Sequence, residues 1–335
     1  MYDPHTIEQV FESFIGKRIL VIGDVMIDSY LWGRVERISP EAPVPIVSLH
    51  RREYRLGGAA NVALNIQNLG GIPVLCGITG QDEKGALFLR LLKEKNLEPD
   101  GIIASKERIT TVKFRIIGNN TQMLRVDEED DRSLQPQEIK LVLKQVETLV
   151  KEGRTDAIVF EDYDKGLIDP ELIRSVLALA KGRGIPVVAD PKKKNFLAYK
   201  GVSLFKPNLK ELREGLKLDG KLETEEDIRA AVQGLQDKLG SGIIMATLSD
   251  KGIYYSQRDD VTTDGFFPGH VRNIADVSGA GDTVISVAAL SLAGGVETGL
   301  MTALCNLAGG LVCEYVGVVP VNKQAFKEEA LRLLC

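Results

Sequence analysis

The chain has 335 residues, enough to bury a substantial core in one large α/β domain or in two smaller ones. Its 42 lysines and arginines against 47 aspartates and glutamates give a net charge of −5, which argues against a general nucleic-acid binder and favours a soluble protein with local anion sites. Four scattered cysteines and three distant histidines form no Cys-x-x-Cys pair and no plausible metal cluster, and we find neither a signal-peptide core nor an apolar run of membrane length, so we expect a cytoplasmic protein without a membrane partner.

Short apolar runs alternate with helical segments along the chain. This alternation predicts an α/β fold with a mainly parallel sheet and helices on both of its faces. Nearly every run is followed by polar residues, and because the carboxyl ends of parallel strands share one edge of the sheet, we expect the active site there. The predicted strands are 19–22, 74–78, 157–160, 187–189, 203–205 and 243–246.

Two regions, 28–55 and 110–127, interrupt this rhythm with strand-like patterns and turn residues. Gly118-Asn119-Asn120 in the second region predicts a hairpin turn. We expect the two regions to form a small β-sheet that serves as a lid. Apolar positions there leave a second use open, pairing with another copy of the chain through residues such as Val44, Ile46 and Val47.

The segment Gly57-Gly58-Ala59-Ala60-Asn61 opens a predicted helix that runs to about Leu69. Its small residues let a ligand approach the backbone, and Asn61 offers both a donor and an acceptor, so the segment suits sugar hydroxyls. Asp24 and Asp28, which bracket the end of the first strand, would supply further acceptors. A tight packing junction for the glycines, and a turn role for Asp28, are the structural alternatives.

Four cationic residues are candidates for binding a phosphate that the substrate already carries. Lys113 and Arg115 stand at alternate positions of one lid strand, Arg125 lies on the next, and Lys165 follows the strand at 157–160. Ordinary surface salt bridges remain the alternative for each of them. In the triple lysine 192–194, we expect Lys192 to point inward.

Asn208 and Glu211 fit the first turn of a helix that follows a strand, and their spacing places both on one face. Such a pair can hold Mg²⁺ through water near nucleotide phosphates, because magnesium keeps much of its hydration. A capping arrangement, with Asn208 as the cap and Glu211 answering it, explains the same spacing.

The stretch 276–283 places a glycine-lined turn and a carboxylate at the start of an apolar helix predicted over 279–293. Gly279, Ala280 and Gly281 let the backbone approach an anion, and the first amides of the helix would stabilise a transferring phosphoryl group. Asp282, in the first turn, is the candidate general base for a substrate hydroxyl. An ordinary helix start with a capping acid is the alternative.

Three common nucleotide-binding motifs do not occur in the sequence. There is no Gly-x-x-x-x-Gly-Lys-[Ser/Thr] loop, no Gly-x-Gly-x-x-Gly and no His-Arg-Asp catalytic loop. These absences argue against P-loop, dinucleotide-binding and protein-kinase interpretations.

Taken in order, Gly-Gly-Ala-Ala-Asn at 57–61, Asn-x-x-Glu at 208–211 and Gly-Ala-Gly-Asp at 279–282 resemble the ribokinase-like (phosphofructokinase-B type) carbohydrate kinases. The resemblance covers nearly the whole chain and implies a single ribokinase-like domain over 1–335 with a β lid that often forms a dimer clasp. The residues at 23–28, 37–45, 162–166 and 190–192 are more closely similar to the heptose 7-phosphate kinases of ADP-heptose biosynthesis.

The resemblance implies an ATP-dependent kinase that phosphorylates the anomeric hydroxyl of D-glycero-β-D-manno-heptose 7-phosphate. It also implies Mg²⁺, possible use of K⁺ near Asp276, and a homodimer. Because the sequence contains no His-x-Gly-His motif, the adenylyltransferase activity that is fused to some such kinases is not expected in it. The residues expected to contact ATP are Asn208, Glu211, Lys192, Thr247, Ser249, Gly252 and Asn306.

Two other functions stay open. A kinase of the same fold could act on an unphosphorylated sugar or a nucleoside, in which case the cations Lys113, Arg115, Arg125 and Lys165 would not meet in the sugar pocket. A catalytically silent sugar-phosphate sensor could keep the fold without turnover.

Overall fold

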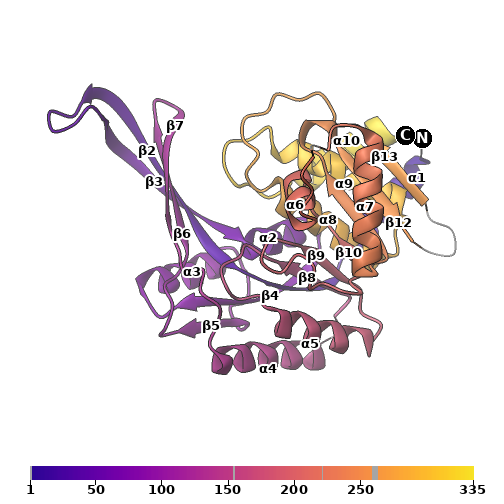
Figure 1. The fold of residues 1–335 in the computed structure, drawn as a ribbon. Coiled ribbons are helices and arrows are strands. Elements are labelled where there is room, and N and C mark those ends of the chain that lie inside the picture. Colours follow the sequence, from indigo (N-terminus) through magenta and orange to yellow (C-terminus); the bar gives the residue numbers. More distant parts are fainter. Residues whose placement is uncertain (1, 154, 221, 259–262) are drawn as a thin grey trace.

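A large, mostly parallel sheet crosses the protein (Figure 1). The computed structural model describes residues 2–153, 155–220, 222–258 and 263–335. The described strands of this sheet follow the order β13-β12-β11-β10-β9-β8-β1-β4-β5, in which β11 with β12 and β12 with β13 pair antiparallel and the other neighbours pair parallel. All six predicted strands are present, which confirms the α/β fold. The strand bounds are β1 Arg18–Gly23, β4 Ile72–Gly80, β5 Ile102–Ser105, β8 Ala157–Glu161, β9 Val187–Asp190, β10 Leu204–Phe205, β11 Ile243–Thr247, β12 Ile253–Gln257 and β13 Thr263–Phe267.

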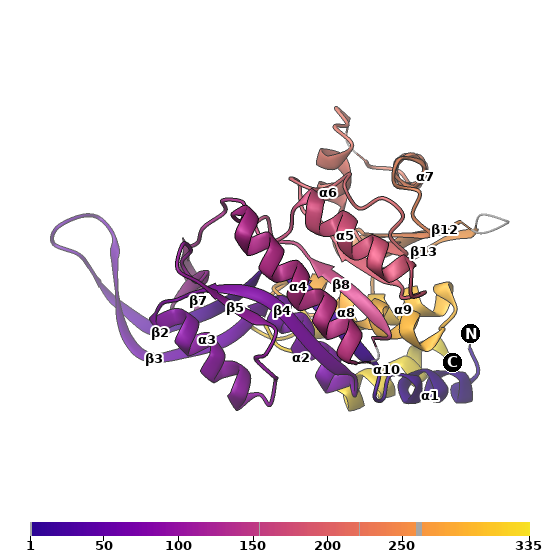
Figure 2. The same ribbon diagram turned by 90° about the horizontal axis from the view of Figure 1, so that it is seen from below.

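Alternating side chains of the strands pack into two hydrophobic cores, one on each face of the sheet. In β1, Ile19 and Val21 enter one core, whereas Leu20 and Ile22 enter the other. The first core is covered by α1 Pro4–Ser13, α2 Ala59–Leu69, α3 Glu83–Glu94, α8 Ala280–Gly294, α9 Thr298–Val312 and α10 Lys323–Leu334. The second is covered by α4 Pro136–Glu152, α5 Pro170–Lys181, α6 Leu209–Gly215 and α7 Glu225–Leu239, of which α4 and α5 lie side by side in Figure 2.

None of the described helices is long and apolar enough to cross a bilayer. A short 3₁₀ turn, η1 Ser249–Lys251, follows β11.

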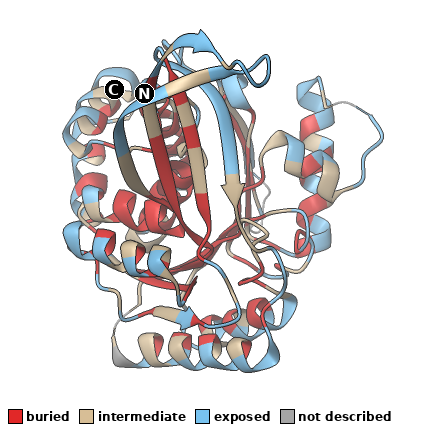
Figure 3. Cartoon of the chain, turned by 90° about the vertical axis from the view of Figure 1, so that its left-hand side faces the viewer, coloured by how far each residue is buried: buried red, intermediate tan, exposed pale blue. Residues whose placement is uncertain are grey.

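A separate small sheet, in the order β3-β2-β6-β7, projects from the body of the molecule (Figure 1). Its strands are β2 Val25–Ile38, β3 Pro45–Gly58, β6 Val112–Gly118 and β7 Thr121–Glu128, so they cover most of the predicted regions 28–55 and 110–127 and extend beyond both ends of the first. Asn119 and Asn120, with φ of 52° and 63°, form the predicted hairpin turn. Nearest the large sheet, β2 is buried up to Tyr30 and β3 from Leu56, whereas the far ends of both strands are mostly exposed (Figure 3).

Two helices begin at the carboxyl edge of the large sheet, and their starts depend on glycine. Gly58 precedes α2 with φ 59° and ψ −135°, and a side chain there would overlap the Asp24 carbonyl. Gly279 precedes α8 with φ 84°. Because α8 is buried almost all round from Asp282 to Ser291, its first turn is held firmly between the sheet, α2 and α9.

We predict that Gly58→Ala destabilises the protein far more than Gly240→Ala. Both positions have positive φ, but a Cβ at Gly240 meets nothing within 4 Å. In Gly240→Ala, the strain of a left-handed backbone should therefore lower the free energy of unfolding by only about 1 kcal/mol. In Gly58→Ala, a clash with the backbone is added, and the free energy of unfolding should fall by about 3 kcal/mol or more. Urea unfolding of both variants measures the difference, and equal losses would contradict the packing described for Gly58.

Candidate active site

Asp282 lies in the first turn of α8 and is only 3% exposed. Its Oδ2 accepts a hydrogen bond from Asn61 Nδ2 at 2.6 Å, and its Oδ1 accepts one from the Tyr163 hydroxyl at 2.7 Å. The carboxylate therefore does not cap its own helix, which is the alternative that the sequence left open. Burial raises the pKa of Asp282 to about 6; the two hydrogen bonds lower it, and nearby Asp190 and Asp28 raise it.

The glycine turn before Asp282 is packed closely against other site residues. A Cβ at Gly279 would lie 3.0 Å from Asn61 Nδ2. One at Gly281 would lie 3.4 Å from Asp190 Oδ2 and 3.6 Å from Lys206 Nζ. The Ala280 amide donates to the Val277 carbonyl at 3.3 Å, so it is partly engaged within its own turn. Stabilisation of a phosphoryl group by these three residues stays a prediction.

Beneath this turn, the ends of β8, β9 and β10 bring together Glu161, Asp190 and Lys206, none of which the sequence singled out for chemistry. Lys206 Nζ lies 2.8 Å from Asp190 Oδ2, and both side chains are at most 5% exposed. Among the residues that the structure describes, none is hydrogen-bonded to either carboxylate oxygen of Glu161 or to Oδ1 of Asp190, and all three atoms are buried. Burial, with Asp190 and Asp282 adding to it, raises the pKa of Glu161 well above its usual value.

Asp24 holds the loop that carries Tyr163. Its carboxylate accepts hydrogen bonds from the backbone amides of Tyr163 at 2.8 Å, Lys165 at 3.1 Å and Leu167 at 3.4 Å. Asp24 is 4% exposed, so its observed contacts are with this loop. Its predicted contact with sugar hydroxyls remains a prediction.

Asp28, on β2, forms a buried ion pair with Arg115 of β6. Gly57 packs against the same carboxylate, because a side chain at that position would overlap Asp28 Oδ2. Arg115 therefore has its partner inside the small sheet, and it is not part of the ion-pair cluster that the other three predicted cations form.

Those three cations share two carboxylates at the base of the small sheet. Lys113 Nζ lies 3.0 Å from Asp127 Oδ2 and 3.1 Å from Glu129 Oε2. Lys165 Nζ lies 2.8 Å from Glu129 Oε1, and Arg125 Nε lies 2.9 Å from Asp127 Oδ1. The structure thus gathers Lys113, Lys165 and Arg125 into one cluster, in which carboxylates occupy the positions that a phosphate would need.

Asn208 and Glu211 form the reciprocal capping box that the sequence left open for the start of α6. Asn208 Oδ1 accepts from the Glu211 amide at 2.9 Å, and Glu211 Oε2 accepts from the Asn208 amide at 2.9 Å. Glu211 Oε1 pairs with Lys192 Nζ, which also lies 5.4 Å from the centre of the Tyr163 ring. Lys192 therefore points inward, as expected, and connects this helix start with the Asp282 region.

A cavity of about 570 Å³ opens beside this helix start, lined in part by Asn208, Lys210, Arg213, Thr247 and Ser249. It brings together three of the residues expected to contact ATP. The two others in the last third of the chain adjoin a neighbouring loop at 267–269. Asn306 Nδ2 donates to the Pro268 carbonyl at 2.8 Å, and a Cβ at Gly252 would contact that loop's backbone.

The start of α6 offers acceptors for a water molecule bound to magnesium. Both Glu211 oxygens already accept a hydrogen bond, but a carboxylate oxygen has further lone-pair sites for a metal-bound water. Within the described ranges, no group of three or more His, Cys, Asp or Glu side chains is arranged to hold a metal directly. Asp276 accepts from the amides of Ser278 and Gly317, both at 2.9 Å, and the K⁺ site near it stays a prediction.

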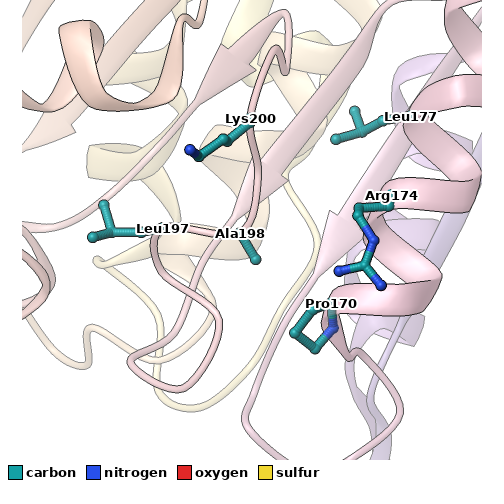
Figure 4. A pocket seen from close by; sticks show the side chains of 6 residues that line it. All are labelled: Pro170, Arg174, Leu177, Leu197, Ala198 and Lys200. Atoms are coloured by element: carbon teal, nitrogen blue, oxygen red, sulfur yellow. The ribbon is translucent and has the colours of Figure 1, made fainter.

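A second hollow, about 450 Å³, lies between α5 and the segment 197–200 (Figure 4). Arg174 and Lys200 stand at its walls, and none of the predicted site residues lines it. The chemistry-bearing residues instead gather at the carboxyl edge of the sheet.

Comparisons with known proteins identify the family and the fold of the chain. Residues 17–324 match the family described as pfkB family carbohydrate kinase. The chain is 39% identical over 319 residues to the bifunctional protein HldE of Koribacter versatilis, covering 95% of this chain and 63% of that protein. It is 37% identical over 328 residues to the bifunctional protein HldE of Syntrophotalea carbinolica, covering 97% and 65%. The chain thus spans less than two thirds of the length of these relatives.

Solved structures share the fold at low sequence identity. Phosphofructokinase-2 from Escherichia coli, in complex with potassium, matches with a TM-score of 0.78 at 19% identity, covering 96% of this chain and 99% of that one. Ribokinase from Thermotoga maritima matches with a TM-score of 0.68 at 18% identity, covering 93% and 99%. The fold is ribokinase-like, and the chain belongs to the pfkB family of carbohydrate kinases.

Proposed function

We propose that this kinase transfers the γ-phosphoryl group of ATP to the anomeric hydroxyl of D-glycero-β-D-manno-heptose 7-phosphate, with Asp282 as the general base. The observation that carries the proposal is the buried Asp282 carboxylate beside the glycine turn of α8. With a pKa of about 6, Asp282 is largely ionised at neutral pH and can accept the proton of a sugar hydroxyl.

Several groups at the carboxyl edge of the large sheet would neutralise the charge of the phosphates. Amides of Gly279, Ala280 and Gly281 would face the transferring group at the start of α8, with Lys206 close behind Gly281. Mg²⁺, positioned by Asn208 and Glu211 through water, would neutralise charge on the nucleotide phosphates. The cavity lined by Asn208, Thr247 and Ser249 supports the placement of the nucleotide on this side.

The sugar would lie between the carboxyl edge of the large sheet and the small sheet. Asn61 already contacts Asp282, and Gly58 packs against the Asp24 carbonyl at the start of the same helix, so we place both close to the reacting hydroxyl. We assign Asp24, Asp28 and Gly57 to the wall of the sugar pocket. Closure of the small sheet over the sugar would exclude water and limit wasteful ATP hydrolysis.

The cluster of Lys113, Arg125 and Lys165 is the proposed subsite for the 7-phosphate. Three cations around two carboxylates are already close together, and a dianionic phosphate can replace a carboxylate as their partner. The 36–39% identity to proteins named HldE over most of the chain supports a heptose phosphate as the substrate. Arg115 is left out of this subsite, because Asp28 is its partner.

One observation favours a different acceptor. Each cation in the cluster already forms an ion pair with Asp127 or Glu129, which suits a structural role and an unphosphorylated sugar or nucleoside as the substrate. Membership of a kinase family argues against the silent sensor.

We also propose a homodimer through the small sheet. Its outer part exposes large apolar side chains on β2, β3, the loop between them, and β7, which an isolated chain would leave in water. Val44 is 52% exposed, while Ile46 and Val47 are partly buried. The exposed apolar residues are Ile38, Val44, Leu49, Met123, Leu124 and Val126.

The four cysteines are unpaired, which is consistent with the reducing cytoplasm that we propose as the location of the protein.

Asp282→Asn tests the base. We expect turnover to fall by roughly 100-fold or more, because the substituted amide cannot take the hydroxyl proton, while calorimetric binding of ATP and sugar stays nearly unchanged. Asp169→Asn is a matched control, since Asp169 caps the start of α5 through the Leu172 amide, outside the carboxyl-edge cluster. Undiminished turnover in Asp282→Asn would remove the mechanism.

Lys165→Ala tests the phosphate subsite. We expect the KM for heptose 7-phosphate to rise about 10- to 100-fold with little change in kcat, as for the loss of one charge-assisted hydrogen bond made equally in the ground and transition states. Lys193→Ala is the control, because Lys193 is 74% exposed and lies outside the cluster. An unchanged KM in Lys165→Ala would favour an unphosphorylated acceptor.

A further inference from the structure

Both oxygens of the proposed base accept hydrogen bonds from side chains of the protein itself. Asn61 occupies Oδ2 and the Tyr163 hydroxyl occupies Oδ1. A base can take a proton from a sugar hydroxyl only if that hydroxyl comes within hydrogen-bond reach of a carboxylate oxygen. Each oxygen has a further lone-pair site, but Asp282 is only 3% exposed, and release of one present donor would give a sugar hydroxyl access to the carboxylate.

Asn61 is the less mobile of the two donors. It is fully buried in the first turn of α2, and its backbone carbonyl accepts a hydrogen bond from Asn65 at 2.9 Å. The Asn61 amide nitrogen also packs 3.0 Å from the position that a Cβ at Gly279 would take. Movement of this side chain would disturb the contact between the starts of α2 and α8.

Tyr163 lies on a loop after β8 and is only partly buried. Asp164 and Gly166, with φ of 57° and 88°, shape this loop, and Asp24 fixes it through backbone amides alone. The side chain of Tyr163 can therefore swing while the backbone stays anchored. Its outer contact is with Lys192, which is itself shared with Glu211.

We propose, on the basis of the proposed function, that the Tyr163 hydroxyl is a stand-in for the acceptor hydroxyl: it occupies Oδ1 of Asp282 until the sugar binds and displaces it. A phenol and a sugar alcohol each present one O–H donor to a carboxylate. Burial, with the negative charges of Asp282, Glu161 and Asp190, raises the pKa of Tyr163 well above its usual value, so the phenol donates its hydrogen bond without losing its proton.

The reaction step leaves Tyr163 unchanged. The O–H bond of the sugar hydroxyl breaks and its proton moves to Asp282 Oδ1. The sugar oxygen forms a bond to the γ-phosphorus of ATP, and the bond from that phosphorus to the β–γ bridging oxygen breaks to release ADP. The stand-in thus keeps the base hydrogen-bonded, and closed to water, during the part of the cycle in which no sugar is present.

The surroundings of Asp282 make this hydrogen bond measurable. Asp28 on β2, Glu161 on β8 and Asp190 on β9 disfavour the ionised carboxylate, and Lys206 on β10 lies beyond Gly281. The hydrogen bonds from Asn61 and Tyr163 oppose the effect of burial on the pKa of Asp282. Because a hydrogen bond to the charged form lowers the pKa of an acid, loss of the Tyr163 bond raises the pKa of Asp282 in the free enzyme.

The test is the pH dependence of Tyr163→Phe, measured with heptose 7-phosphate and ATP. The acid limb of kcat/KM reports the free enzyme, and we expect its apparent pKa to rise by about one pH unit in Tyr163→Phe. The acid limb of kcat reports the complex, in which the sugar has already replaced the phenol. Its apparent pKa should therefore stay the same. Tyr199→Phe is the matched control, because its hydroxyl donates to Asp162 at 2.9 Å and not to Asp282. Equal movement of both limbs, or of neither, would overturn the displacement.

A second measurement uses the wild-type protein and does not depend on the variant folding. With ¹³Cζ-labelled tyrosine, the resonance of Tyr163 should shift when heptose 7-phosphate saturates the enzyme, and that of Tyr199 should not. A stationary Tyr163 resonance with sugar bound would overturn the proposal. Absence of turnover in the wild type would count against the proposed substrate. Normal turnover in the wild type, with equal shifts of the two acid limbs in Tyr163→Phe, would count only against the displacement of Tyr163 by the sugar.

Discussion

The structure depends on keeping one carboxylate, Asp282, buried at the start of α8. Removing an ionised carboxylate from water costs several kcal/mol unless donors replace the lost solvent. Here the donors are Asn61 at the start of α2 and Tyr163 on the loop after β8, and the amino end of α8 adds its dipole. Three elements far apart in the sequence are therefore positioned by the requirements of a single side chain.

The remaining charges at the carboxyl edge are arranged around this group. Glu161 and Asp190 stand on neighbouring strands at matched register, and Lys206 neutralises Asp190 from the next strand. No described residue donates a hydrogen bond to Glu161, and burial together with Asp190 and Asp282 raises its pKa well above the usual value in spite of the nearby Lys206 and Lys192. Carboxyl groups with raised pKa values in one cleft are typical of functional sites.

Local patterns predicted much of this fold. The six strands, the turn at Asn119 and Asn120, and the starts of α2, α6 and α8 follow from apolar periodicity, glycine and capping residues. The contact between Tyr163 and Asp282, 119 residues apart, depends on the order of the strands, which no local pattern contains. The same holds for Asp28, whose partner Arg115 is set by the parallel pairing of β2 with β6. Sequence reasoning could identify the polar strand ends but could not assign their partners.

The most direct measurement is phosphorus NMR of the products that form when the purified chain is given ATP, Mg²⁺ and a choice of acceptors. Heptose 7-phosphate would be offered beside ribose, fructose, fructose 6-phosphate and adenosine. The Asp282 site and the cation cluster together predict a single new anomeric phosphate on the heptose, formed in step with ADP. Phosphorylation of an unphosphorylated acceptor in preference, or no product with any acceptor, would contradict the function proposed for this site.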